Sequence, residues 1–138
     1  MASQGLSPAY QAVLRELQSE FLTLLPERVS ELRNALKLVE TDLAARTTLR
    51  RVGHRIAGTA ATVSLKDVGS VGRAIEEFVA AREGVEGAWS HDEVARVAGA
   101  VALLDEWAAE ALSAHEPRAE PLLQDPRFLA LLPDEATP

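Results

Sequence analysis

His54 is the residue of this chain whose type and setting best suit chemistry. It stands in the run Val-Gly-His-Arg-Ile-Ala-Gly-Thr-Ala, residues 52–60. A neutral imidazole is a nucleophile near pH 7. On a helical wheel of roughly 100° per residue, His54 points about 160° away from the centre of the apolar face. That face holds Leu49, Val52, Ile56, Ala60 and Val63. We therefore expect an exposed histidine that a second protein can reach.

Three arginines surround His54 in the sequence. Arg50 and Arg51 lie one turn before it, and Arg55 follows it. Guanidinium groups bind phosphate oxygens through forked hydrogen-bond donors. In a chain of net charge −7, such a cluster of cations stands out. The alternative is a solvated helix face, with the arginines paired to nearby Asp or Glu.

Small residues lie next to His54 on the same helix. A glycine inside a helix costs about 1 kcal/mol relative to alanine, so Gly58 calls for a reason. We expect Gly58 on the outward side, where packing within the domain does not require it. Ala57 and Ala61 border that face. The pattern predicts a smooth platform that lets another domain approach the imidazole closely.

Helical periodicity runs through almost the whole chain and predicts an all-α fold. Ser7 and Pro8 begin the first helix, and Pro26 separates it from a second that continues to Val39. The expected architecture is an antiparallel up-and-down four-helix bundle with an additional N-terminal helix. Three further helices are expected over Leu43–Val63, around Leu65–Val79, and around Val94–Leu112.

Capping signals and a tail complete this organisation. Thr41 or Asp42 is expected to cap the helix that carries His54, and Ser90 with Glu93 forms a capping box. Ser64 with Asp67 resembles a second capping box. We assign residues 1–113 to the bundle and 114–138 to a tail with one short helix opening at Asp125–Pro126. The tail's leucines and Phe128 either dock on the bundle or meet a partner.

Composition narrows the class of protein. The chain has 138 residues, enough for one domain, and no cysteine. A net charge of −7 argues against nucleic acid or an anionic membrane as partner. No apolar run reaches the roughly 18 residues of a membrane span, and the N-terminus lacks the pattern of a signal peptide. We expect a cytoplasmic protein.

The run from His54 to Ala60 resembles the signature of histidine phosphotransfer (HPt) domains. In that family a histidine is followed by a variable residue, an aliphatic one, often a lysine, then glycine and small residues. The likeness extends more loosely from Phe21-Leu22 to Ala74-Ile75-Glu76. It implies a phosphocarrier whose histidine exchanges a phosphoryl group, usually on Nε2, with the aspartate of a response-regulator receiver domain. The implied partners are such a receiver, which holds the Mg²⁺, and a sensor or hybrid histidine kinase. The chain itself is expected to be a monomer without a cofactor.

The resemblance also implies roles for the residues around His54. His54 is the phosphoryl acceptor and Gly58 gives the receiver clearance. Arg50, Arg51 and Arg55 are expected to face the phosphoryl group or the receiver. Contacts at the edge of the site are expected from Ala57, Thr59, Ala61 and Lys66. A side chain of a neighbouring helix is expected to orient Nδ1, but the sequence does not identify it. The adjacent Glu76 and Glu77 are interpreted as a solvated face.

Ala57 departs from the family pattern, because a lysine is common at that position. A second interpretation therefore stays open: a phosphotransfer-inactive HPt-like module that only binds a receiver or a kinase. No nucleotide-binding motif is present, so the chain is not expected to phosphorylate itself. Neither His91 nor His115 forms a metal-ligand pair with His54, so no metal site is expected. An enzyme with an unrecognised site is the weakest reading, because no second catalytic group stands at a fixed spacing from His54.

Overall fold

The computed structural model describes residues 7–83, 87–114 and 122–133, and these residues form helices without a strand. Four long helices are followed by a short 3₁₀ helix and one short α-helix. They are α1 (Pro8–Leu38), α2 (Leu43–Thr62), α3 (Lys66–Arg82), α4 (His91–Ala114), η1 (Leu122–Gln124) and α5 (Pro126–Leu129). The all-α prediction is confirmed.

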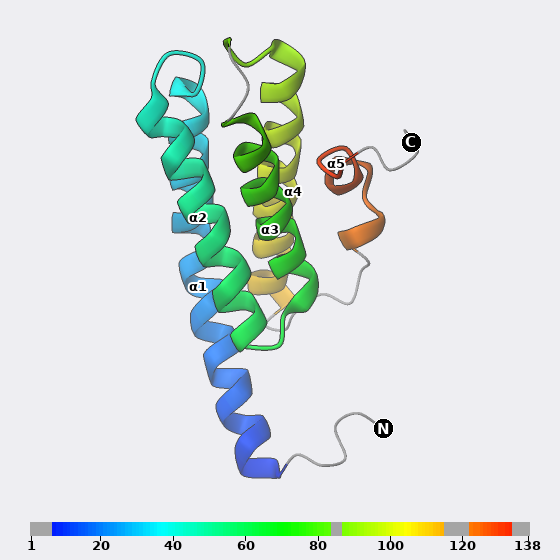
Figure 1. The fold of residues 1–138 in the computed structure, drawn as a ribbon. Helices are drawn as coiled ribbons and strands as arrows, with labels where there is room; N and C mark the ends of the chain where they lie inside the picture. The colour runs from blue at the N-terminus through cyan, green and yellow to red at the C-terminus, as the bar shows by residue number, and fades with distance from the viewer. Residues whose placement is uncertain (1–6, 84–86, 115–121, 134–138) are drawn as a thin grey trace.

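The four long helices form a bundle around one apolar core. In Figure 1 the chain rises along α1, returns along α2, rises along α3 and returns along α4. α1 packs on α2 and α4, and α3 packs on the same two helices. Leucine, valine and alanine fill the interior, as the shortage of aromatic residues requires. The largest fully buried side chains are Leu25, Leu32, Leu49, Ile56, Ile75 and Leu104.

α1 is one continuous helix of 31 residues with Pro26 inside it. The prediction of a separate N-terminal helix ending before Pro26 was therefore wrong. Proline lacks the N–H that would bond to the carbonyl one turn earlier, which costs about 3 kcal/mol in a helix interior. Apolar side chains on both sides of Pro26, from Leu22 and Leu25 to Val29 and Leu32, are buried in the same core. Burial of each such side chain is worth about 1.5–3 kcal/mol, so core packing keeps the helix continuous.

The first turns of α1 extend beyond the rest of the bundle (Figure 1). The Gln18 side-chain amide donates to the Val63 carbonyl at the end of α2, over 2.9 Å. The turns before Gln18 continue past this point. Tyr10, Val13 and Leu17 are accordingly exposed. Ser7 caps the helix as predicted, accepting from the Tyr10 N–H over 3.1 Å.

The turn between α2 and α3 differs from the sequence prediction. Ser64 does not cap α3, whose N-cap is Leu65 without a side-chain hydrogen bond. Ser64 instead has φ 64°, and it closes the preceding helix. The Leu65 N–H donates to Ala60 O over 2.8 Å and the Ser64 N–H to Ala61 O over 3.2 Å. This is the Schellman arrangement of a helix C-terminus. The predicted caps at Asp42 and Ser90–Glu93 are confirmed.

The C-terminal segment docks on the bundle over residues 122–131. η1 contacts α3 and α5 contacts α4, and Leu122, Phe128 and Leu131 are buried. The predicted short helix is present, with Asp125 accepting from the Arg127 N–H over 2.8 Å. Residues 115–121 and 134–138 of the expected tail lie outside the described residues.

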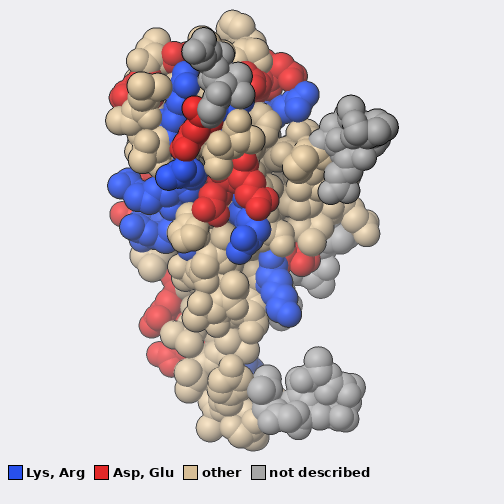
Figure 2. All heavy atoms as spheres, in the orientation of Figure 1, with Lys and Arg blue, Asp and Glu red and all other residues tan. Residues whose placement is uncertain are grey.

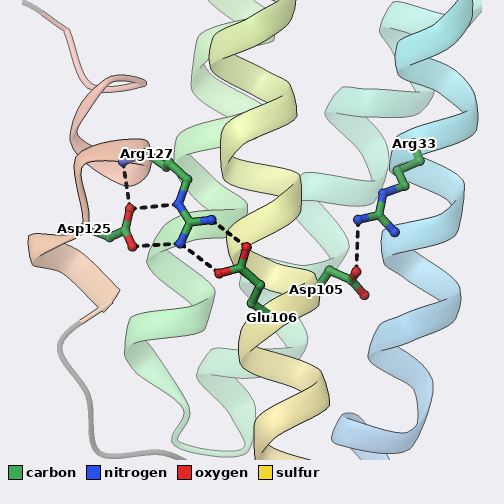
Figure 3. Close-up of polar contacts among 5 residues, drawn as sticks. All are labelled: Arg33, Asp105, Glu106, Asp125 and Arg127. Carbon is green, nitrogen blue, oxygen red and sulfur yellow. Dashed lines mark hydrogen bonds and ion pairs between the residues drawn. The ribbon is translucent and has the colours of Figure 1, made fainter.

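Arg127 fixes this segment to α4 through Glu106, and Asp125 of the same segment holds the guanidinium in place (Figure 3). Its guanidinium contacts Glu106 over 2.7 and 3.0 Å and Asp125 over 3.0 Å. Hydrogen bonds from Arg127 hold the pKa of both carboxyls below their usual range. A separate ion pair, Arg33–Asp105 at 2.9 Å, joins α1 to α4.

Within the described part of the chain, no helix is both long enough and apolar enough to cross a membrane.

Candidate functional site

His54 projects from the exposed side of α2 and is held by a residue of α3. Its side chain is 75% exposed, and Nδ1 lies 2.8 Å from the Glu76 carboxylate. A carboxylate only accepts hydrogen bonds, so Nδ1 carries the proton in this contact. The lone pair of the neutral ring is then on Nε2. The histidine thus presents its nucleophilic nitrogen away from α3.

Glu76 is the orienting residue that sequence analysis did not identify. It had been interpreted with Glu77 as a solvated pair, which is wrong for Glu76. The Glu76 side chain is only 24% exposed because it lies against α2, whereas Glu77 is exposed. The two side chains diverge by about 100° on the helix, so only one of them reaches His54.

Two glycines bring α2 and α3 together beside this pair. A Cβ added at Gly53 would lie 2.9 Å from the Gly72 carbonyl oxygen and 3.1 Å from the Glu76 N. A Cβ at Gly72 would lie 2.9 Å from the Gly53 carbonyl oxygen. These obstacles are backbone atoms, which cannot move aside without separating the helices. Gly53 immediately precedes His54, so the close crossing sets the distance from His54 to Glu76.

Gly58 has a different setting from Gly53. A Cβ built at Gly58 would meet no atom within 4 Å among the described residues. Gly58 lies one turn after His54 and is exposed. The glycine is therefore not needed for packing within this domain, as the sequence predicted.

Ala57 and Ala61 differ in solvent exposure, although both were expected to border the exposed face. Ala61 is exposed, but Ala57 is only 5% exposed. The expectation that Ala57 contributes to the platform was wrong in geometry, because α3 crosses over it. A Cβ at Gly69 would lie 3.3 Å from the Ala57 carbonyl oxygen.

The three arginines near His54 point in different directions. Arg50 forms an ion pair at 2.9 Å with Glu83, the residue that caps the C-terminus of α3, as the alternative of a paired, solvated face had anticipated. Arg55 turns toward α1, where it lines a small hollow with Arg28 and Thr59. Phe21, Leu24, Leu25 and Ile56 complete the lining. Arg51 is exposed and has no ion pair among the residues the structure describes.

Charge is unevenly divided over this face of the molecule. Figure 2 shows basic side chains gathered over α2 and acidic side chains beside them over α3, with further basic side chains below. Lys66 is exposed at the start of α3, one residue after the turn that follows α2. An anionic group held at His54 would therefore lie next to the basic side chains over α2.

The other histidines stand apart from His54. His91 is exposed at the first residue of α4, and His115 lies outside the described residues. Among the described residues, no three or more His, Asp and Glu side chains are grouped in a way that could hold a metal ion.

Comparison with protein families agrees with this geometry. The family model of the Hpt domain matches residues 16–115. The chain belongs to the Hpt domain family. Comparisons with curated proteins and with solved structures found no match. Hpt domains take part in two-component phosphorelays as phosphotransfer carriers, and they normally interact with receiver domains and histidine kinases. The resemblance inferred from residues 54–60 is confirmed.

The Hpt match covers most of the bundle but not its two extensions. It begins inside α1, so residues 8–15 precede it, and η1 and α5 follow it. The residues around His54 lie well within the matched range.

Proposed function

We propose that His54 accepts a phosphoryl group on Nε2 from the aspartate of a response-regulator receiver domain, or donates it to one. The observation that carries this proposal is the contact between Nδ1 and Glu76 at 2.8 Å. A carboxylate that fixes the tautomer leaves Nε2 as the nucleophile and exposes it to the partner. Membership in the Hpt family supports the same assignment.

The transfer step follows from this tautomer. The Nε2 lone pair attacks the phosphorus of the receiver's acyl phosphate, forming the N–P bond. The P–O bond to the aspartate breaks, and the carboxylate leaves with the electron pair. The Nδ1 proton stays in place, and the positive charge that develops on the ring is balanced by the Glu76 carboxylate. Transfer in the opposite direction is the reverse of this step.

Clearance and charge on the α2 surface support docking of a receiver. Gly58 leaves open space next to His54, and Arg51 projects from the same side of the helix. We assign to Arg51 and Arg55 contacts with the receiver surface, and to Thr59, Ala61 and Lys66 positions at the edge of the docking area. Arg50 serves mainly to tie α2 to α3 through Glu83.

We infer that the carrier works as a monomer in the cytoplasm, on an antiparallel up-and-down bundle. Its partners are a receiver domain and a sensor or hybrid histidine kinase, with neither nucleic acid nor membrane involved. The Mg²⁺ that assists transfer belongs to the receiver, so this chain supplies only the imidazole, its orientation and a charged docking surface.

A phosphotransfer assay with purified proteins tests the proposal. A panel of receiver domains, each phosphorylated at its aspartate, is mixed with this protein or with the His54→Gln variant. We expect label to move from at least one receiver to the wild-type protein and none to the variant. Full labelling of His54→Gln would contradict the assignment. Binding of a receiver without any phosphoryl transfer would favour the alternative of a phosphotransfer-inactive HPt-like module. That alternative remains because position 57 is alanine and not lysine.

A further inference from the structure

The register of α3 against α2 places one further cation beside His54. A Cβ at Gly69 would approach the Ala57 carbonyl oxygen, and a Cβ at Gly72 would approach that of Gly53. Glu76, one turn further along α3, reaches His54. The segment of α3 from Gly69 to Glu76 therefore lies alongside the segment of α2 from Ala57 back to Gly53. Arg73 falls within it, level with residues 54–57.

The direction of Arg73 follows from helix geometry. At about 100° per residue, Arg73 lies about 40° from Gly69 and about 60° from Glu76 around the axis of α3. It lies about 100° from Gly72, which is pressed against Gly53. Arg73 is exposed. Arg73 therefore lies at the solvent-exposed edge of the contact between α2 and α3, on the same side as His54.

Apart from Arg51, which has no ion pair among the described residues, the other arginines near the site are engaged elsewhere. Arg50 is paired with Glu83 at 2.9 Å, Arg28 with Glu31 at 2.7 Å, and Arg82 with Glu93 at 2.7 Å. Arg55 lines the hollow on the α1 side of α2. Arg73, in contrast, has no ion pair or hydrogen-bonded side-chain partner among the residues the structure describes.

On α2, the residues Ala57 and Gly58 have no long side chain that would keep Arg73 from extending toward His54. Ala57 is buried beneath α3, and a Cβ at Gly58 would meet nothing within 4 Å. The position where the family often has a lysine therefore has no cation in this chain. The surface at Gly58, one turn after His54, is open to a side chain from α3.

We propose that Arg73 contacts the phosphoryl group on His54 and takes the part of the cation missing at Ala57. The inference rests on His54 being the phosphoryl acceptor. The guanidinium donates two hydrogen bonds to phosphoryl oxygens while the N–P bond forms or breaks at Nε2. It stabilises the charge on the transferring group and adds no bond-making step of its own.

Phosphorylation by a small donor tests this role without a cognate partner. Wild-type protein and the variants Arg73→Ala and Arg73→Lys are incubated with phosphoramidate, and phosphohistidine is followed by ³¹P NMR. Arg15→Ala, on the exposed first half of α1, is the matched control for loss of one surface arginine. We expect Arg73→Ala to slow phosphorylation about tenfold, the loss that one hydrogen bond to a charged group implies, and Arg73→Lys to retain most of the rate. The Arg15→Ala control should stay close to wild type.

Salt separates a charge effect from a structural one. The Debye length falls from about 10 Å at 0.1 M to about 3 Å at 1 M ionic strength, so the rate difference between wild type and Arg73→Ala should shrink in 1 M salt. If the wild type is labelled and Arg73→Ala is labelled at the same rate, the role of Arg73 is overturned but the proposed function is not. The same holds if Arg73→Ala is slow and Arg73→Lys is equally slow. Absence of phosphohistidine in the wild type, or its persistence in His54→Gln, would overturn the proposed function itself.

Discussion

At the scale of single residues, the function depends on how one imidazole is held. His54 is largely exposed, and an exposed histidine has two tautomers and a mobile ring. The contact with Glu76 at 2.8 Å selects the tautomer with the proton on Nδ1 and limits rotation of the ring. The neighbouring arginines form no hydrogen bond with the imidazole in the part of the chain that the structure describes, so the proton on Nδ1 depends on Glu76 and not on them.

Substitutions of Glu76 should affect transfer in a graded way. Glu76→Gln keeps an oxygen that accepts from Nδ1 but removes the charge, and we expect transfer to slow a few-fold. Glu76→Ala removes the acceptor as well. A hydrogen bond to a charged group is worth about 1.5 kcal/mol, and about 1.4 kcal/mol is tenfold in rate, so we expect roughly a tenfold loss. Rates are measured with a phosphorylated receiver.

Glu77→Gln is the matched control for the Glu76 series, because it removes the adjacent carboxylate that points away from His54. Equal effects of Glu76→Ala and Glu77→Gln would show that overall charge, and not the contact with Nδ1, governs the rate.

At the scale of helices, the site is built where α2 and α3 cross closely. Gly53 and Gly72 each place backbone within 2.9 Å of where the other's Cβ would be. Such contacts leave no freedom for a side chain. Glu76 reaches His54 because this crossing holds the helices near each other, so the site depends on residues without functional groups.

Two glycines on α2 should respond in opposite ways to the same substitution. Gly53→Ala forces the helices apart, and overpacking of this kind costs about 1–3 kcal/mol. Gly58→Ala meets no obstacle within the domain, and alanine is favoured over glycine in a helix by about 1 kcal/mol. Thermal unfolding should therefore show a lower Tm for Gly53→Ala and a Tm raised by about 4 °C for Gly58→Ala.

Transfer rates complete the comparison of the two glycines. We expect Gly58→Ala to be more stable and yet slower in exchange with a receiver, because its methyl group occupies the clearance beside His54. A Gly58→Ala variant that gains stability and transfers at the wild-type rate would show that this clearance is not used.

At the scale of the whole molecule, the C-terminal segment is fastened to α4 by Arg127. Its hydrogen bonds lower the pKa of Glu106 and of Asp125 from ordinary values of 4.5 and 3.8. Carboxyls whose pKa is lowered on folding stabilise the fold fully above their ordinary pKa, and this stabilisation is lost as the pH falls below it. Glu106 is exposed and Asp125 is only half-buried, so the effect is modest.

Arg127→Met tests this attachment, because it removes the charge and keeps an apolar stem over Gly99. We expect the wild type to have the higher Tm at pH 7, with the difference shrinking at pH 3. Faster hydrogen exchange at residues 128–132 in the variant would locate the loss in the segment. A difference in Tm that is the same at both pH values would contradict the ionic attachment.

Much of this architecture was predictable because it depends on local sequence. Periodicity and capping residues identified the helices, and the direction of His54 followed from one helical wheel. The prediction of a helix boundary at Pro26 was wrong because the free-energy cost of a proline inside a helix is outweighed by packing against other helices. Ser64 misled because the same residue suits a helix start and a helix end. The partner of Nδ1 and the burial of Ala57 depend on the register of α3 against α2, which no pattern within either helix contains.

NMR of the phosphorylated protein shows whether Nε2 of His54 carries the phosphoryl group, as we propose. With ¹⁵N-labelled histidine, coupling to ³¹P identifies the nitrogen that is bonded to phosphorus. We predict a phosphorus bond to Nε2 of His54, with the proton retained on Nδ1. Phosphorus on Nδ1, or on any residue other than His54, would contradict the account.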